Sequence, residues 1–130
     1  MKTIGIGVDI LDNVRIKKLI KNNVFLNKIF TKKEIILSKK INNKPAYFAK
    51  RFAAKEAFSK SLGSGFRNGL SFKDISIVND KLGKPSFYIS DKLKNIIKKK
   101  FKIKKFNFLL SISDEKKYSL AFVIFQKLWK

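Results

Sequence analysis

The stretch FAKRFAAKEAFSKSLGSGF, residues 48–66, decides how the rest of this chain is organised. Alanine and phenylalanine recur in it at three- and four-residue spacing, which predicts a helix. The helix is expected to open near Pro45 and to end at Gly63, because proline favours the first helical turn and glycine the position just past the last. We therefore expect one long helix against which the other elements pack.

The same stretch contains a single carboxylate, Glu56. In a helix, Phe52, Glu56 and Lys60 stack in one row, so an acid and a base stand side by side above an aromatic ring. The glycines of residues 63–65 that follow allow close approach to backbone N–H groups. Together these features suggest a site for a metal and a phosphate. Taken alone, they also fit a solvated Glu–Lys pair and a simple helix cap.

Composition limits the chemistry that this chain can use. Its 130 residues fit one compact domain, and hydrophobic residues make up 45%, which is enough for a core. Cysteine and histidine are both absent. That absence excludes disulfides, thiolate metal sites and Cys nucleophiles, and it removes the commonest general base. Catalysis would have to use carboxylates, lysines, hydroxyls or an oxygen-bound metal such as Mg²⁺.

The net charge of the chain indicates its binding partners, and its apolar segments indicate its cellular location. Lysine and arginine number 31 against nine acids, a net charge of +22. This balance favours polyanionic partners, although an AT-rich coding sequence produces the same excess of lysine without selection for binding. The chain has neither a signal-peptide apolar region nor a run long enough to span a membrane. We expect a cytoplasmic protein.

Asp9 is the second acidic residue, after Glu56, that is a candidate for a functional site. Residues 3–11 predict a buried strand with Asp9 near its end, between apolar neighbours. A carboxylate there is costly unless it is paired or bound to a cation. The alternative role of helix N-cap belongs to Asp12, which precedes a helical pattern over residues 13–21.

The remaining segments predict an α+β domain that covers residues 1–130. Short helices are expected over residues 24–29 and from a capping box at Thr31 to about residue 40, and a third helix, capped by Asp91, ends near residue 100. Strands follow from alternating or continuous apolar patterns, with a hairpin turn at Gly83 and an apolar final strand that should be central. These strands are residues 74–79, 85–90, 107–113 and 118–126.

Taken together, these motifs resemble a known family, the holo-[acyl-carrier-protein] synthases, which are small 4'-phosphopantetheinyl transferases. The resemblance covers nearly the whole chain and implies a mostly antiparallel sheet packed against a long central helix. It also implies Mg²⁺-dependent transfer of phosphopantetheine from coenzyme A to a serine of apo acyl carrier protein, in fatty acid biosynthesis, with release of adenosine 3',5'-bisphosphate. The motifs that carry it are GIGVDI, FTKKE, RFAAKEAFSKSLGSGF, RNGLSFKDI, NDKLGKP and SISDEKKYSLAFVI.

The resemblance assigns catalytic and metal-binding roles residue by residue. In the family, the acids of the GIGVD and KEA motifs bind Mg²⁺, and these are Asp9 and Glu56 in this sequence. The lysine four residues after the glutamate, Lys60, contacts the phosphate. Cations at these positions would neutralise the charge of a displacement at phosphorus. The serine proton would pass to Glu56 or to a metal-bound water.

Other positions are implied to bind the two substrates. Gly63, Ser64 and Gly65 line the coenzyme A site in the family, Arg51 helps to hold the nucleotide phosphates, and Arg15 meets the acidic carrier protein. Ser64 stands where many relatives have threonine, which keeps the hydroxyl.

Further family properties remain expectations. Members are typically homotrimers whose active sites are shared between neighbouring subunits. Asp114 stands where many relatives have histidine, so no role of that histidine is carried over, and we expect Asp114 to be a turn residue. The alternative function is a basic nucleic-acid-binding module, suggested by the charge and by the aromatics of residues 101–108. Nonspecific nucleic-acid binding at low salt is expected in either case.

Overall fold

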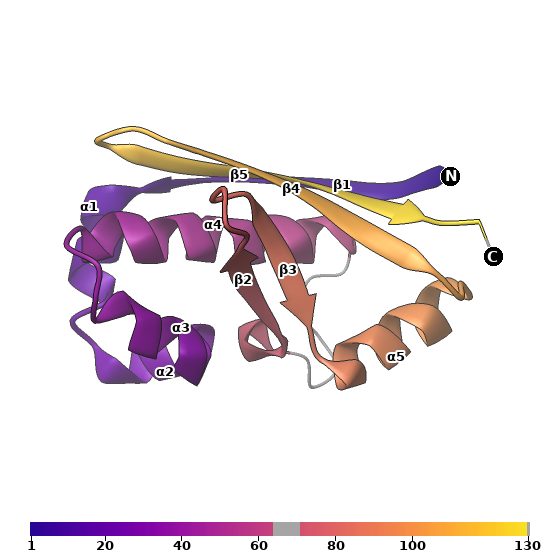
Figure 1. Cartoon of the computed structure of the whole chain (residues 1–130), viewed down its shortest axis with the longest axis horizontal. Coiled ribbons are helices and arrows are strands. Elements are labelled where there is room, and N and C mark those ends of the chain that lie inside the picture. Colours follow the sequence, from indigo (N-terminus) through magenta and orange to yellow (C-terminus); the bar gives the residue numbers. More distant parts are fainter. Residues whose placement is uncertain (64–70, 130) are drawn as a thin grey trace.

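The computed structural model describes residues 1–63 and 71–129 and contains helices and antiparallel strands, as the α+β prediction required. Figure 1 shows the helices gathered on one side of the longest strands. The elements are β1 (Lys2–Asp12), α1 (Asn13–Leu19), α2 (Asn23–Ile29), α3 (Lys32–Ser38), α4 (Lys44–Ser61), η1 (Phe72–Asp74), β2 (Ile75–Asn79), β3 (Pro85–Ile89), α5 (Asp91–Phe101), β4 (Phe106–Asp114) and β5 (Tyr118–Lys127).

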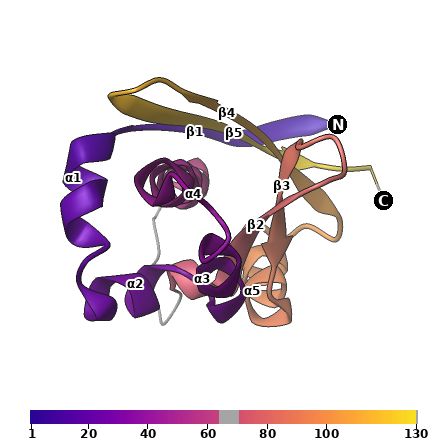
Figure 2. The same ribbon diagram turned by 60° about the vertical axis from the view of Figure 1, so that its left-hand side comes forward.

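The strands form two antiparallel sheets. The larger has the order β1-β5-β4, and β2 and β3 form a two-stranded sheet. Strand β5 is central, as its apolar sequence predicted. Helix α4 runs beneath the larger sheet, with β2 and β3 on another side of the helix (Figure 1), and Figure 2 shows α4 enclosed by the sheet, α1 and the smaller helices. The predicted packing of an antiparallel sheet against a long central helix is confirmed.

Helix α4 has the ends that the sequence predicted. The Asn43 side chain accepts a hydrogen bond from the Ala46 N–H at 3.1 Å, and Pro45 lies in the first turn, where its missing N–H is not needed. After the C-cap at Leu62, Gly63 adopts a left-handed φ of 81°, which glycine tolerates best. Eleven of its eighteen residues are buried and only Lys44 and Lys60 are exposed, which explains why its apolar residues are not confined to one stripe.

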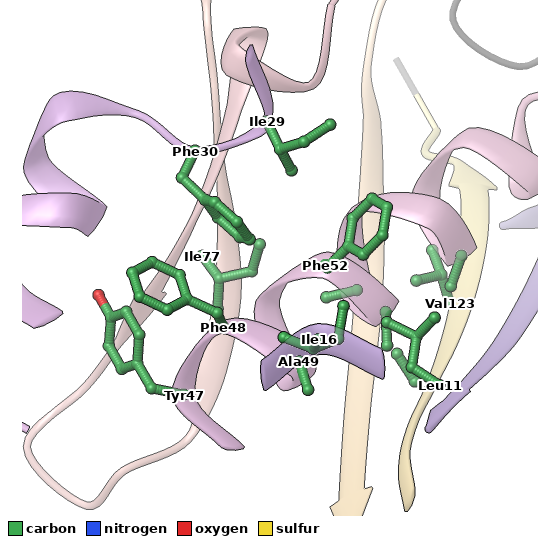
Figure 3. Packing of buried hydrophobic residues seen from close by; sticks show 14 residues of the cluster. Leu11, Ile16, Ile29, Phe30, Tyr47, Phe48, Ala49, Phe52, Ile77 and Val123 are labelled. Atoms are coloured by element: carbon green, nitrogen blue, oxygen red, sulfur yellow. The ribbon is translucent and has the colours of Figure 1, made fainter. Parts of the chain in front are cut away.

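Aromatic side chains of α4 form the centre of the larger core. Phe30 packs against Phe48, with ring centroids 4.7 Å apart, and lies edge-on to Phe52 at 6.5 Å. Figure 3 shows the rings of Phe30 and Phe48 beside Tyr47 and Ile77. Each fully buried side chain of this size contributes about 1.5–3 kcal/mol through removal of apolar surface from water. This core fixes α4 against α2 and β2, and so fixes the helix that carries Glu56.

Two glycines of β1 allow α4 to lie directly on the strand. A Cβ added to Gly7 would overlap the carbonyl oxygen of Ala57, and one added to Gly5 would overlap the carbonyl oxygen of Ser61. Any side chain at either position would therefore push the strand and the helix apart. Because Asp9 follows Gly7 on the same face of the strand, this contact sets how close Asp9 comes to the helix.

One prediction about β1 is wrong. The strand over residues 3–11 was expected to be buried, but only the face towards α4 is covered, because nothing in the described part of the chain packs on the opposite face of the sheet. The outward side chains of Ile6, Val8 and Ile10 are 61%, 49% and 59% exposed. The apolar residues of β1 that point away from α4 therefore form an exposed hydrophobic face.

Most of the helix caps and turns predicted from the sequence are present in the structure, but one helix cap is not. Asp12 caps α1 and Thr31 forms the capping box of α3, as expected. Gly83 has a left-handed φ of 87° in the β2–β3 turn. Helix α5, however, is capped by Ser90, whose side chain accepts from the Leu93 N–H, and Asp91 is its first residue. Among the described residues, no helix is both long and apolar enough to cross a membrane.

Candidate active site

Asp9 and Lys60 meet where β1 crosses the end of α4. The Lys60 Nζ lies 3.2 Å from Asp9 Oδ1 and donates to the Val8 carbonyl oxygen at 3.0 Å. The Asp9 side chain is 14% exposed and the Lys60 side chain is 56% exposed. The Asp9 carboxylate is therefore largely buried between β1 and α4, whereas the Lys60 side chain is exposed to solvent, where an incoming anion can reach it.

Glu56 lies one turn before Lys60 and is half-buried. Loss of solvent raises the pKa of Glu56, and the charge of Asp9 raises it further, whereas Lys60 and Arg15 act in the opposite direction. Asp9, Glu56 and Lys60, predicted from the sequence, are therefore brought together, with Arg15 near enough to interact. Lys60 was expected beside Glu56, but within the described residues it forms its ion pair with Asp9.

The carboxylate pair is suited to a hard cation. Asp9 Oδ2 is buried and accepts no hydrogen bond within residues 1–63 and 71–129, which is costly for a charged oxygen. Mg²⁺ prefers oxygen ligands and is usually held by one or two carboxylates together with substrate phosphates and waters. No cluster of three acidic, His or Cys side chains occurs in the described residues. Asp9 and Glu56 fit an ion that takes its remaining ligands from a substrate.

Arg51 lies elsewhere on α4. It donates to the Tyr47 carbonyl oxygen and to Asn79 Oδ1, each at 3.2 Å, and its guanidinium lies 3.6 Å from the centre of the Tyr47 ring. Burial lowers the pKa of Arg51, and its Nε has no hydrogen-bond partner among the described residues. Arg51 lines a pocket of about 500 Å³ together with Tyr47, Lys50, Asn79, Gly83, Pro85 and Asp114.

The Arg51 pocket and the Asp9 cluster face different sides of the helix. Arg51 and Glu56 are five residues apart, which places them roughly 140° apart around the helix axis. Glu56 and Lys60 are on the side of β1, whereas Arg51 contacts Asn79 at the end of β2. The structure does not bring Arg51 to the predicted metal site within one chain.

The comparison with known proteins identifies the family. A family model described as the 4'-phosphopantetheinyl transferase superfamily matches residues 5–123. The chain belongs to this superfamily. It is 63% identical to the holo-[acyl-carrier-protein] synthase of Pelagibacter ubique (strain HTCC1062), over 98% of this chain and 99% of that protein. It is 47% identical to the holo-[acyl-carrier-protein] synthase of Wolbachia pipientis, over 92% and 94%.

Solved structures of phosphopantetheinyl transferases agree with the fold. The holo-[acyl-carrier-protein] synthase of Neisseria meningitidis superposes with a TM-score of 0.86 at 39% identity, covering 96% of this chain and 99% of that one. The holo-(acyl-carrier-protein) synthase of Bacillus anthracis, solved in complex with CoA (3',5'-ADP), gives a TM-score of 0.80 at 33% identity, with coverage of 98% and 100%. The family resemblance and enzyme class inferred from the motifs are confirmed.

The other positions singled out in the sequence of this phosphopantetheinyl transferase lie on different elements or outside the described residues. Gly63 is exposed at the end of α4, whereas Ser64 and Gly65 lie outside the described residues. Arg15 is exposed on α1. Asp114 is the last residue of β4, and its Oδ2 lies 4.0 Å from Lys50 Nζ beside the Arg51 pocket.

Sequence reasoning missed a buried ion pair in this transferase. Lys55 Nζ lies 2.7 Å from Glu34 Oε1, and Glu34 Oε2 accepts from the Ile77 N–H at 3.1 Å. Glu34 was expected only as part of the capping box. A signal was present: Lys55 lies three residues after Phe52 and seven after Phe48, so a charge occupies the row of buried aromatics and needs a partner.

Proposed function

We propose that this enzyme transfers the 4'-phosphopantetheine group of coenzyme A to a serine of an apo acyl carrier protein and releases adenosine 3',5'-bisphosphate, as a step of fatty acid biosynthesis. The observation that carries the proposal is the convergence of Asp9, Glu56 and Lys60. Relatives named for this activity, and a solved relative bound to CoA (3',5'-ADP), support it. A basic nucleic-acid-binding module is not favoured, because it gives these three residues no role.

Asp9 and Glu56 would hold Mg²⁺, and Lys60 would bind the substrate phosphates. When bound, the ion would supply positive charge to the diphosphate of coenzyme A, whose P–O bond is broken: the phosphate next to pantetheine is transferred to the serine, and the other phosphate leaves with the nucleotide. Lys60 adds a second positive charge from its exposed position at the mouth of the site. Glu56 has two carboxylate oxygens, so one can hold the ion while the other accepts the serine proton. These are the charges that a displacement at an anionic phosphorus requires.

The carrier protein would approach along α1. Arg15 is exposed on this helix and close enough to Glu56 to lower its pKa, so an acidic partner bound to Arg15 lies near the reacting groups. Lys17 and Lys18 on the same helix add positive charge. Attraction between this helix and an acidic carrier would raise the association rate, and salt would weaken it.

The enzyme would act as a homotrimer with shared sites. Arg51 faces away from Glu56 on the same helix, so a coenzyme A that touches both needs the Arg51 pocket of a neighbouring subunit. Gly63 would line the coenzyme together with Ser64 and Gly65, which lie outside the described residues. The uncovered face of the larger sheet offers an interface, because an exposed apolar face of this kind is typical of a contact surface. Its exposed members are Ile6, Val8, Ile10, Leu109, Tyr118 and Phe122.

Intact-mass measurement tests the reaction. Apo acyl carrier protein is incubated with the enzyme, coenzyme A and Mg²⁺, with and without a chelator. We expect the carrier to gain one phosphopantetheine only when free Mg²⁺ is present. Glu56→Gln should abolish the gain, whereas Glu115→Gln, which changes an exposed carboxylate, should not. A normal rate in the Glu56→Gln variant would contradict the assigned metal site, and no gain with the unaltered enzyme would contradict the function.

A further inference from the structure

A second groove lies at the opposite end of α4 from α1, between β3, α5 and β4. Strand β3 leads into α5, and α5 leads into β4, so these three elements follow one another around this end of the molecule (Figure 1). The groove has a volume of about 470 Å³, which is within the range of ligand sites. None of its lining residues belongs to the Asp9 cluster or to the Arg51 pocket.

The floor of the groove is hydrocarbon. It is lined by half-buried side chains: Phe87, Ile89, Phe106, Phe108 and Leu128. The aromatic rings pack edge-on against one another, with centroids of Phe106 and Phe108 5.7 Å apart and those of Phe87 and Phe108 6.3 Å apart. Rings that are packed together in this way offer an apolar surface and not a free face for stacking a base.

The rim of the groove is cationic. Lys94 and Lys98 stand one turn apart on α5, and Lys104 and Lys105 follow the helix. All four are exposed, and no acidic residue lines the groove. Within the described part of the chain, none of the four lies in an ion pair. Their charges are therefore available to an anion that enters the groove.

We propose that this groove binds a single-chain amphiphilic anion, of which a fatty-acid carboxylate is the simplest example. The acyl chain lies on the floor made by Phe87, Phe106 and Phe108, and the carboxylate lies among the lysines of the rim. Charge complementarity selects an anion, and the apolar floor selects one with a hydrocarbon tail. A polynucleotide would use the rim but leave the floor exposed to water.

Binding to the full-length enzyme, in the absence of coenzyme A and carrier protein, tests this site. The probe is dodecanoate, kept below its micelle concentration and followed by titration calorimetry or by the fluorescence of Trp129, which is the single tryptophan and follows Leu128 in sequence. We expect dodecanoate to bind at least tenfold more tightly than acetate, which lacks the tail, or dodecyltrimethylammonium, which lacks the negative charge. Lengthening the chain should tighten binding by up to about fourfold per methylene until the floor is covered.

Matched variants separate the groove from the general charge of the protein. Lys98→Glu with Lys105→Glu should weaken dodecanoate binding at least tenfold. Lys21→Glu with Lys40→Glu makes the same change of net charge at exposed positions outside the groove, and should alter binding less than twofold. Equal weakening in both pairs would overturn the proposal, because it would show attraction to net charge only.

A third variant tests the floor without changing charge. Ser86 is exposed and lines the groove, so Ser86→Trp should fill the space and weaken dodecanoate binding at least tenfold, as measured by calorimetry because the variant adds a second tryptophan. Ser113→Trp, on an exposed position of β4 outside the groove, is its control. Undiminished binding in the Ser86→Trp variant would overturn the proposal. The proposal would also be overturned if the protein did not bind dodecanoate but bound phosphatidylglycerol vesicles or polynucleotide through Lys98 and Lys105. Phosphopantetheine transfer is measured separately, so its outcome does not affect this test.

Discussion

The Nζ of Lys55 lies 2.7 Å from Oε1 of Glu34, and the two side chains are 0% and 2% exposed. Lys55 also donates to the carbonyl oxygens of Ile29 at 2.8 Å and Phe72 at 3.0 Å. One ammonium group thereby joins α4 to the end of α2, to α3 and to η1. Burial lowers the pKa of Lys55, and the carboxylate of Glu34 opposes that effect.

Removing one member of this pair should destabilise the protein strongly. Lys55→Met leaves the carboxylate of Glu34 buried without its cation, which we expect to cost about 3–5 kcal/mol of unfolding free energy. Urea denaturation measures the loss, with Lys73→Met as the exposed control. The double variant with Glu34→Gln should lose less than the sum of the two single losses, since the two residues are in contact. An unchanged urea midpoint for Lys55→Met would contradict the importance of the pair.

A side chain at Gly7 should separate Asp9 from Glu56, the two carboxylates proposed to bind Mg²⁺. In Gly7→Ala the new Cβ overlaps the carbonyl oxygen of Ala57, so β1 must move away from α4, taking Asp9 away from Glu56. We expect a loss of stability of about 1–3 kcal/mol, as for overpacking elsewhere, and a raised Mg²⁺ requirement for transfer. Thr3→Ala, at an exposed position of the same strand, should change neither property. A Gly7→Ala enzyme with a normal Mg²⁺ requirement would refute this account of the site.

Without metal, replacing Glu56 should stabilise the protein. The folded state raises the pKa of Glu56 through burial and the charge of Asp9, so ionisation of Glu56 opposes folding. This penalty is present above the folded-state pKa and disappears as pH falls below the unfolded value of about 4.3. In the presence of a chelator, Glu56→Gln should therefore melt a few degrees higher than the unaltered protein at neutral pH, and the difference should vanish near pH 4. A difference that is independent of pH would exclude charge as the cause.

Two inactive variants should restore activity to each other if sites are shared between subunits. Arg51→Ala removes the pocket cation and Glu56→Gln removes a carboxylate proposed to bind Mg²⁺, and we expect each protein alone to transfer little phosphopantetheine. After denaturation and joint refolding, a mixed trimer contains sites with both intact residues. With equal amounts and random assembly, about a quarter of the sites should be intact, being half of one half. If the mixture stays as inactive as its components, both residues serve a site within one chain.

Local features could be predicted from the sequence because their causes are local. Pro45, Gly63 and Thr31 determine helix ends through their own backbone geometry or hydrogen bonds, and the structure has them as expected. Asp9 could be proposed because it is an acid between apolar neighbours, and Glu56 because it is the single carboxylate of the long helix, one turn before Lys60. The resemblance of the motifs to a known family then gave the fold and the enzyme class.

Other features depend on contacts between distant segments. The exposure of Val8 depends on which face of the sheet is covered, and the partner of Lys55 is a glutamate 21 residues away. The contact of Arg51 with Asn79 depends on which element lies against that side of α4. None of these follows from a pattern within one segment, because periodicity identifies an apolar face but not what lies against it.

The contact of Gly5 and Gly7 with α4 also bears on motion at the site. Because main chain touches main chain there, the separation of Asp9 from Glu56 is governed by two stiff backbones and does not vary with the rotamers of intervening side chains. The enzyme would therefore meet coenzyme A with its anionic ligands already spaced, and little ordering entropy would be lost on binding. The choice of substrates would then depend mainly on how well coenzyme A and the carrier protein fit around a carboxylate pair whose spacing is already set.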